Sequence, residues 1–244
     1  MNVASYYVMK KLYLLMAIIL ITISGCAVIK NHIIKERRKS FVHLLAVSEI
    51  QPGFMFPVSM ASGFVVQTGD NHNVVLTAAH FCVRSMEEKE MSFHDSFHVA
   101  TIDERQSVGT IIAVDRSIDV CLLRIDNLGV HAVKFAANPP SITDEVINIG
   151  APAGLVDKNM VMIYEGRYMG IKRDCATDNV CAIYNIPAYP GSSGSFILND
   201  DGELVGMVSA TVGGFYHMAM SPTWNQMINF VEKEIDLSYV ISSN

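Results

Sequence analysis

Three short segments carry side chains that together suit nucleophilic attack on a carbonyl carbon. His80 ends the stretch TAAH, Asp119 lies in SIDV, and Ser193 lies in PGSSGS. A histidine base, an aspartate that orients the base and a serine nucleophile follow in this chain order in one established arrangement for acyl transfer. Each segment alone is weak evidence, because single histidines and Gly-x-Ser-Gly strings are common in ordinary loops. Their joint order and spacing predict a catalytic triad.

The glycine two residues before the serine indicates how developing negative charge would be stabilised. Gly191 permits a tight backbone turn, so that its own amide and that of Ser193 can point at one place. Two such donors form an oxyanion hole. The structural alternatives are a turn serine at 193, a satisfied core histidine at 80 and a strand-start cap at 119. Asp115 is a competing orienting residue, but it lies farther from the strand that follows.

Composition limits the classes to which the chain can belong. Of its 244 residues, 50% are hydrophobic and 17% are charged, and the formal net charge is −6. This apolar content is enough for a packed core and argues against disorder beyond the N-terminus. The acidic balance argues against nucleic acid as the main partner. Short β-branched runs between turn residues predict an all-β protein.

The pattern of apolar runs divides into two halves at the sequence NPP, residues 138–140. Strands of the first half are expected over 41–47, 62–66, 73–77, 97–102, 107–114 and 120–125. Strands of the second half are expected over 145–150, 161–164, 167–172, 181–186, 195–198 and 203–210. A helix is expected over 222–235, where apolar side chains recur at helical spacing. His80 and Asp119 therefore fall at strand boundaries, where a rigid scaffold can fix a side chain.

The N-terminus has the features of an export signal. Two lysines at 10 and 11 precede an apolar run over 12–23, and the sequence ISGC ends at Cys26. This ending resembles a bacterial lipobox, in which cleavage follows residue 25 and the cysteine is acylated. A start at Met9 would give a signal of ordinary length. The alternative is an uncleaved signal anchor. We expect a signal peptide over 1–25 and a basic tether over 26–40 that can lie against anionic headgroups.

Several of these segments resemble the trypsin-like serine peptidases, and most closely the bacterial Deg/HtrA group. The resemblance rests on the segment 114–125 around Asp119, on IGAPAG at 149–154, and on GSSGS at 191–195 followed by DGELVG at 201–206. It implies an all-β fold of two six-stranded Greek-key β-barrels with a C-terminal helix. The barrels would cover 41–137 and 138–244, with the active site in the cleft between them.

The chain departs from that family pattern at three points. Family members often have Gly-Pro where this chain has Ser195-Phe196. The chain ends at Asn244, soon after the resemblance ends, so we do not expect assembly or activation through the PDZ domain that many Deg proteins carry. Ser192 replaces the aspartate that pairs with a freed N-terminus in the digestive enzymes, so activation by that route is not expected.

The resemblance also implies where substrate would bind. Pro187 would lie at the base of the S1 pocket, where it carries no acid, so small or medium apolar P1 side chains are expected rather than basic ones. Ser209, Ala210 and Thr211 would form the strand that lines the substrate backbone. His217 would either reach the pocket and favour glutamate at P1 or serve a structural role in the last strands.

The five cysteines suit an exported protein, because thiols tend to pair outside the cytoplasm. Cys175 and Cys181 flank good turn formers and are expected to close a hairpin with a disulfide. Cys82 and Cys121 either pair inside the first half or remain buried free thiols. No zinc-ligand spacing is present, and no metal or cofactor is implied.

Together these features favour a membrane-tethered serine endopeptidase that faces the periplasm or cell exterior and acts on proteins or peptides. The alternative from another class is a catalytically silent domain that keeps the fold and binds peptides or partner proteins. The complete set of His80, Asp119 and Ser193 favours the enzyme.

Overall fold

The computed structural model describes residues 11, 16, 28–51, 53–85, 92–175 and 180–235. The chain divides into two units, Met1–Glu36 and Arg37–Asn244. In the first unit residues 28–36 are helical. No helix among the described residues is both long and apolar enough to cross a membrane. The predicted signal peptide, apart from Lys11 and Met16, and the predicted acylation site Cys26 lie outside the described residues.

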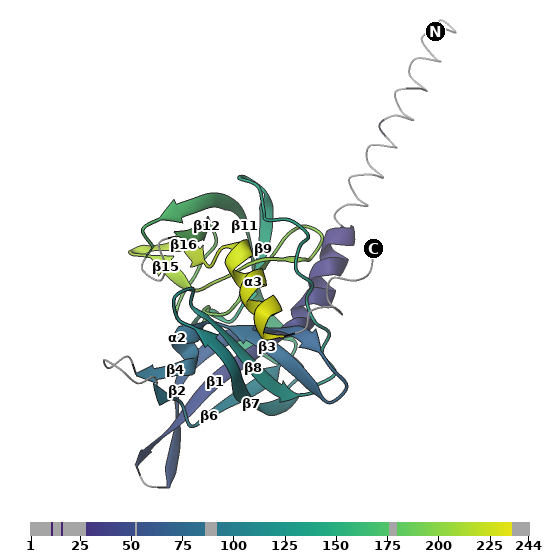
Figure 1. Ribbon diagram of the computed structural model, residues 1–244. Coiled ribbons are helices and arrows are strands. Elements are labelled where there is room, and N and C mark those ends of the chain that lie inside the picture. Colours follow the sequence, from purple (N-terminus) through teal and green to yellow (C-terminus); the bar gives the residue numbers. More distant parts are fainter. Residues whose placement is uncertain are drawn as a thin grey trace, which may run out of the picture. The chain divides into compact units, whose positions relative to one another are not determined.

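The first half of the second unit is a closed antiparallel barrel, in the order β1-β2-β3-β8-β7-β6 (Figure 1). Its interior is filled by apolar side chains that alternate with outward-facing ones along the strands, as a small barrel requires. Leu44, Val65 and Leu123 are among these fully buried residues. The strands are β1 (Phe41–Gln51), β2 (Phe54–Thr68), β3 (His72–Thr77), β6 (Ser96–Thr101), β7 (Gln106–Asp115) and β8 (Val120–Asp126).

Three short elements and one 3-10 turn complete this half. The helix α2 (Ala79–Cys82) begins two residues after β3 and carries His80. It runs into β4 (Val83–Ser85), which pairs with β5 (Ser92–Phe93). The 3-10 turn η1 (Arg38–Ser40) leads into β1. All six strands predicted for the first half are present, and β1 and β2 extend beyond their predicted bounds as a long hairpin.

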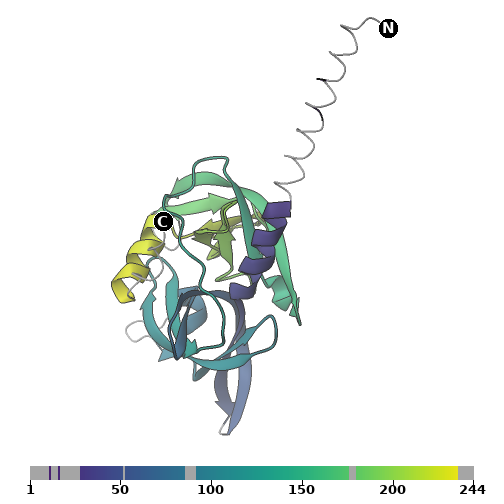
Figure 2. The same cartoon turned by 90° about the vertical axis from the view of Figure 1, so that its right-hand side faces the viewer.

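The second half is a curled sheet in the order β14-β13-β9-β11-β12-β16-β15, with β10 added beside β11 (Figure 2). A 3-10 turn, η2 (Pro152–Gly154), follows β9. The long strand β11 spans two of the predicted strands and pairs with β9 and then with β12. The strands are β9 (Glu145–Gly150), β10 (Val156–Asp157), β11 (Met160–Arg173), β12 (Val180–Tyr184), β13 (Phe196–Leu198), β14 (Leu204–Met207), β15 (Ala210–Val212) and β16 (Phe215–Ser221).

The predicted fold class is confirmed, with one difference in the second half. That half is an eight-stranded curled sheet rather than a closed six-stranded barrel. Its two end strands, β14 and β15, are successive stretches of one segment. Between them Val208 N donates to Ser195 O, and Ser209 N donates to Met220 O. The segment thus changes from one partner strand to another. The two ends of the sheet are joined by the covalent chain and not by a ladder of backbone hydrogen bonds.

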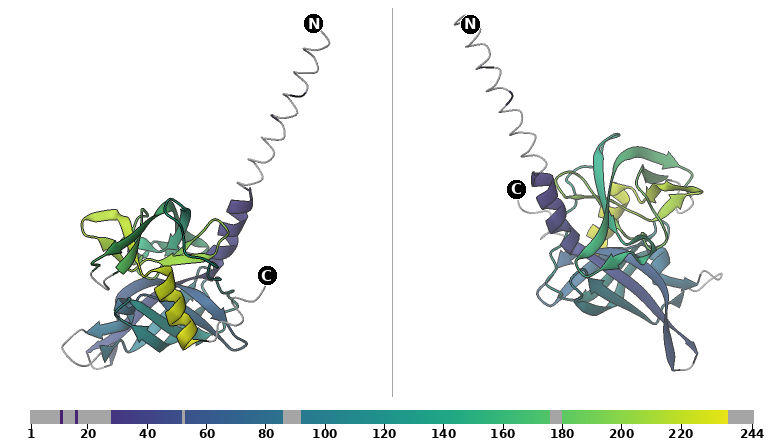
Figure 3. Two further views of the ribbon diagram at one scale, coloured as in Figure 1. Left: turned by 45° about the horizontal axis from the view of Figure 1, so that its top comes forward. Right: turned by 180° about the vertical axis from the view of Figure 1, so that it is seen from behind.

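The C-terminal helix α3 (Trp224–Glu234) lies within the predicted range. Thr223 caps it, because its side chain accepts from the Gln226 amide while the Gln226 side chain accepts from the Thr223 amide. Met227 and Val231 are buried on its inner face. The helix lies against β14 of the second half and β7 of the first, and so braces both halves (Figure 3).

The two halves also meet through buried side chains close to the predicted site. The rings of Phe64 on β2 and Phe196 on β13 lie 5.1 Å apart between centroids, and neither ring is exposed to solvent. A backbone hydrogen bond of 2.8 Å runs from Ser62 N to Ser193 O in the same region. The predicted nucleophile is therefore anchored to the first barrel although it belongs to the second half.

Candidate active site

His80 and Asp119 lie beside the ends of two adjacent strands of the first barrel: His80 on α2 just after β3, and Asp119 just before β8. Thr77, at the end of β3, pairs with Cys121 of β8, so the residues just after β3 face the residues just before β8. Asp119 Oδ1 accepts a hydrogen bond from the His80 backbone amide at 2.8 Å. Asp119 Oδ2 lies 2.8 Å from His80 Nδ1. The carboxylate therefore fixes both the backbone and the ring of the histidine.

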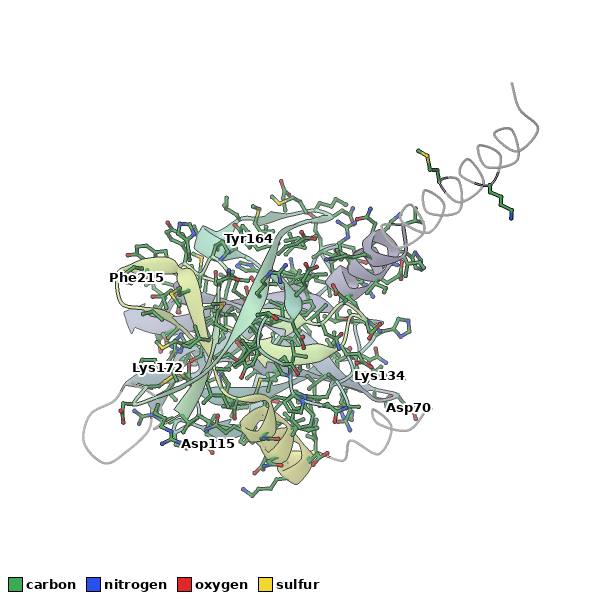
Figure 4. All side chains as sticks on the ribbon, turned by 90° about the horizontal axis from the view of Figure 1, so that it is seen from above. Asp70, Asp115, Lys134, Tyr164, Lys172 and Phe215 are labelled. Atoms are coloured by element: carbon green, nitrogen blue, oxygen red, sulfur yellow. A yellow bond between two sulfur atoms is a disulfide. The ribbon has the colours of Figure 1, made fainter. Side chains whose placement is uncertain are left out.

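Asp119 is only 4% exposed. Besides His80, the Ser209 hydroxyl donates to Asp119 Oδ2 at 2.5 Å. The backbone of Asp119 is left-handed, with φ of 58°, which aspartate tolerates better than most residues. The competing Asp115 is engaged elsewhere, because its Oδ1 accepts from the amide and the hydroxyl of Ser117. Figure 4 labels Asp115 beside the C-terminal helix.

The other ring nitrogen of His80 faces the predicted nucleophile. His80 Nε2 lies 2.9 Å from Ser193 Oγ, which is within reach for proton transfer. Burial on its own would lower the pKa of His80. The hydrogen bond and negative charge of Asp119 outweigh that effect and raise the pKa above its usual value. The side chain remains 49% exposed, so one side of the ring is open to solvent and to an incoming group.

The loop that carries Ser193 depends on two glycines with left-handed backbones. Gly191 has φ of 94° and Gly194 has φ of 82°. A Cβ on Gly194 would lie 2.0 Å from Ser62 O, and one on Gly191 would lie 2.6 Å from Ala151 O. Both positions therefore need glycine for conformation and for space. The Gly-x-x-Gly spacing follows from how tightly the loop packs on the first barrel and on η2.

The amides predicted to form an oxyanion hole are not used by the loop itself. Among the residues that the structure describes, no hydrogen bond engages the N–H of Gly191 or the N–H of Ser193. The neighbouring groups are all held: Ser192 N donates to Tyr189 O, and Pro190 O accepts from Ala153 N at 2.7 Å. Because a trans peptide sets N–H opposite C=O, the Pro190–Ala153 bond aims the Gly191 N–H away from η2.

The residues predicted to contact substrate lie on the strands beside this loop. Ala188 N donates to Tyr216 O, which joins the segment after Pro187 to β16. Pro187 is partly exposed. Ala210 and Thr211 pair with β16 through Met220 and Ala219.

Two of those predicted residues need further comment. The side chain of Ser209 is buried and donates to Asp119, so its predicted role in substrate binding is left to its backbone. His217 is exposed on β16. Figure 4 shows the nearby Phe215 at the edge of the molecule, where it is 63% exposed.

Two disulfides join cysteines within the described part of the chain. Cys175 and Cys181 are joined across the end of the β11–β12 hairpin. Cys82 of α2 and Cys121 of β8 are also joined, and both are fully buried. Each of this second pair lies two residues after a member of the predicted triad. Within the described ranges, no three His, Cys, Asp or Glu side chains gather as a metal site would need.

Comparison with known families agrees with this geometry. The family model described as "Trypsin-like peptidase domain" matches residues 61–207. This chain belongs to that family. The matched region begins on β2 and ends with β14, so it contains all three predicted triad residues. No curated protein sequence matches the chain.

Solved structures with the same fold include proteases of low sequence identity. An inactive form of Rv3671c from M. tuberculosis is 18% identical with a TM-score of 0.65, covering 85% of this chain and 92% of that one. The serine endoprotease from Yersinia pestis is 18% identical with a TM-score of 0.65, covering 84% and 66%. The HtrA-type protease AlgW, solved with a tripeptide, is 14% identical with a TM-score of 0.69, covering 85% and 64%.

The sequence did not reveal two buried serines that support the site. Ser209 lies in the predicted substrate strand, and Ser62 lies in the apolar stretch of β2. Each reaches a partner about 90 or more positions away, at Asp119 and Gly191. The available signal was a serine beside apolar residues in a stretch that was expected to be buried, since a buried hydroxyl requires a hydrogen-bond partner.

Proposed function

We propose that this protein is a serine endopeptidase that uses Ser193, His80 and Asp119. The observation that carries the proposal is a continuous chain of hydrogen bonds across the two halves. Asp119 Oδ2 lies 2.8 Å from His80 Nδ1, and His80 Nε2 lies 2.9 Å from Ser193 Oγ. These are the mutual roles by which such triads are recognised. Family membership supports the same reaction class.

The proposed reaction proceeds in two acyl-transfer steps. Ser193 Oγ attacks the scissile carbonyl carbon while His80 Nε2 takes the hydroxyl proton, and the resulting oxyanion accepts from the amides of Gly191 and Ser193. His80 then gives its proton to the leaving nitrogen as the C–N bond breaks. A water molecule repeats the sequence on the acyl-enzyme, with His80 again as base, and releases the acid and free Ser193. Asp119 holds the imidazole in the required tautomer throughout.

A fluorophosphonate probe tests this proposal directly. It reacts with an activated serine, so we expect the wild-type protein to be labelled and Ser193→Ala to remain unlabelled. Hydrolysis of a peptide library by Ser193→Ala is expected to fall by about a millionfold. Ser192→Ala is the matched control, because Ser192 is buried beside the nucleophile and accepts from the Tyr189 amide. An unlabelled, correctly folded wild type would favour the silent binding domain, and equal loss of labelling in both variants would contradict the assignment of Ser193 as the nucleophile.

The segment beside the nucleophile supports apolar side chains at P1. Pro187 and Ala188 offer no charge to a basic substrate residue, and Ala188 is buried. We therefore propose cleavage after small or medium apolar residues. Profiling of cleavage sites with a peptide library tests this, and a dominant preference for Lys, Arg or Glu at P1 would contradict it.

Membrane tethering is a separate part of the proposal and rests on the sequence. The ISGC ending and the basic stretch after it support a lipoprotein that is anchored through acylated Cys26 and faces the periplasm or cell exterior. In Cys26→Ala, incorporation of labelled palmitate is expected to stop and uncleaved precursor to accumulate in the membrane. Detection of residues upstream of Cys26 in the mature wild-type protein would indicate a signal anchor instead.

A further inference from the structure

Ser62 is a fully buried residue of β2 that contacts three other segments of the site. Its amide donates to Ser193 O at 2.8 Å. Its hydroxyl donates to Gly191 O at 2.9 Å and accepts from Ala151 N at 2.9 Å. Its carbonyl accepts a hydrogen bond of 2.8 Å from the hydroxyl of Thr77, a residue three positions before His80. One residue of the first barrel thus touches the backbone on both sides of Ser192.

These contacts act on the direction of the amide that is predicted to bind the oxyanion. The two carbonyls that flank the Gly191 α-carbon are both held: Pro190 O by Ala153 N, and Gly191 O by the Ser62 hydroxyl. Because each peptide group is planar and trans, turning the Gly191 N–H out of the site would have to break the Pro190–Ala153 bond. The Ser62 hydroxyl restrains the peptide group on the other side of the Gly191 α-carbon.

The same hydroxyl also acts through η2. Ala151 N, which donates to Ser62 Oγ, begins the turn whose Ala153 N holds Pro190 O. In this turn Gly154 N donates to Ala151 O, so Ala151 and the amide of Ala153 belong to one hydrogen-bonded unit. Ser62 therefore restrains Gly191 both directly and through the turn behind it. Ala153 has a left-handed φ of 53°, a conformation that persists only where surrounding contacts hold it in place.

We propose that Ser62 is a positioning residue that holds the nucleophile loop with the amides of Gly191 and Ser193 turned toward the reacting carbonyl. The proposal rests on the peptidase function proposed above and adds a residue that touches neither substrate nor His80. A serine hydroxyl suits this role because it can donate one hydrogen bond and accept another at the same time. Alanine at this position would leave Gly191 O and Ala151 N without their buried partner.

The test compares Ser62→Ala with Ser107→Ala. Ser107 on β7 is also buried, and its hydroxyl likewise donates and accepts hydrogen bonds, with Asp126 and Val108 O and not with the site. Removal of one oxyanion donor costs about 10²–10³ in kcat, so partial loss of its orientation in Ser62→Ala is expected to cost about 10- to 100-fold, with KM within about threefold. Ser107→Ala is expected to keep the wild-type kcat, even if its melting temperature falls as much as that of Ser62→Ala.

Hydrogen–deuterium exchange supplies a readout that does not depend on activity. Peptides covering residues 187–195 are expected to exchange faster in Ser62→Ala than in the wild type. In Ser107→Ala the exchange rate of these peptides is expected to equal that of the wild type. The pH of half-maximal activity should stay fixed, since Ser62 does not contact His80. If Ser62→Ala does not fold, Ser62→Cys replaces it, because a thiol of similar size is only a weak donor and acceptor.

Faster exchange together with the loss in kcat would establish the role. Unchanged kcat, or unchanged exchange over residues 187–195, would overturn it. If the wild type proves not to hydrolyse peptides or react with the probe, the proposed function fails, and the exchange data still decide whether Ser62 holds this loop.

Discussion

The Ser209 hydroxyl donates a hydrogen bond of 2.5 Å to Asp119 Oδ2, and the two residues lie 90 positions apart on different halves of the fold. The carboxylate also accepts from the His80 amide and faces the His80 ring. Asp119 is therefore fixed by donors from both halves. Since Ser209 follows β14, the position of the second sheet helps to set the angle of the imidazole toward Ser193.

Removal of the Ser209 hydroxyl is expected to weaken catalysis without unfolding the protein. A typical hydrogen bond contributes about 1 kcal/mol, so Ser209→Ala should lower kcat/KM by roughly fivefold. Steady-state hydrolysis of one peptide by both proteins measures this ratio. Ser209→Thr keeps a hydroxyl and is expected to lie closer to the wild type. Equal activity of Ser209→Ala and wild type would show that Asp119 needs no third donor.

The pH dependence of activity should reflect the raised pKa of His80. The base must be neutral to take the Ser193 proton, so activity is expected to rise with pH and to be half-maximal above about 6.5, the ordinary histidine value. Stability has the opposite sign: a raised folded-state pKa favours folding below the unfolded value, and this contribution is lost as pH rises through the folded pKa. A kcat/KM profile with NMR titration of the imidazole measures the trend in activity, and denaturant unfolding over the same pH range measures the trend in stability.

Asp119→Asn separates the causes of that shift. Burial alone lowers the pKa of His80, and Asp119 supplies the opposing effect. In Asp119→Asn the pKa of His80 should therefore fall below that of the wild type, while kcat falls by about 10⁴, as expected when the tautomer is no longer held. An unchanged pKa in this variant would mean that another group raises it.

The parts of the site that could be predicted from the sequence are those with a local signature. The segments of the predicted triad, the two amides proposed for the oxyanion hole and the pair Cys175 and Cys181 each combine recognisable neighbours within a few positions. The strands followed from β-branched runs, and helix α3 from its apolar stripe and its cap at Thr223. Residues whose role depends on neighbouring positions in the sequence can be predicted from the sequence alone.

The supporting contacts could not be predicted, because they arise where the two halves meet. Ser62 reaches Gly191 across 129 positions, and no local pattern encodes that pairing. The link between the two ends of the second sheet likewise depends on Val208 and Ser209. Val208 bonds to the segment that begins β13 and Ser209 bonds to β16, and hydrophobic alternation does not reveal this change of partner. Side-chain identity shows that a buried serine needs a partner, but only packing shows which one.

Gly194 should be the least replaceable glycine of the nucleophile loop. Its φ is 82°, and a Cβ would lie 2.0 Å from Ser62 O and 2.4 Å from Thr77 Oγ1. Gly194→Ala is therefore expected to lower stability by several kcal/mol, on the order of 2–4, through strain and overlap. Gly213→Ala is the control, because nothing lies within 4 Å of its Cβ position. Thermal unfolding of both variants measures the difference, and similar melting temperatures would contradict the packing described for this loop.

The two disulfides should differ in what their loss does. Cys82–Cys121 closes a long loop between the His80 and Asp119 segments, and its removal as Cys82→Ala/Cys121→Ala is expected to cost about 4 kcal/mol of stability. Cys175–Cys181 closes a short one, so Cys175→Ala/Cys181→Ala should cost only about 2 kcal/mol. Its larger effect should be on turnover, because β12 leads through Tyr184 toward Pro187 and the segment predicted to bind substrate. Denaturant unfolding and peptide hydrolysis of both double variants give the two readouts. Free thiols at Cys175 and Cys181 in the protein purified without reductant, or a turnover unaffected by their loss, would contradict this assignment.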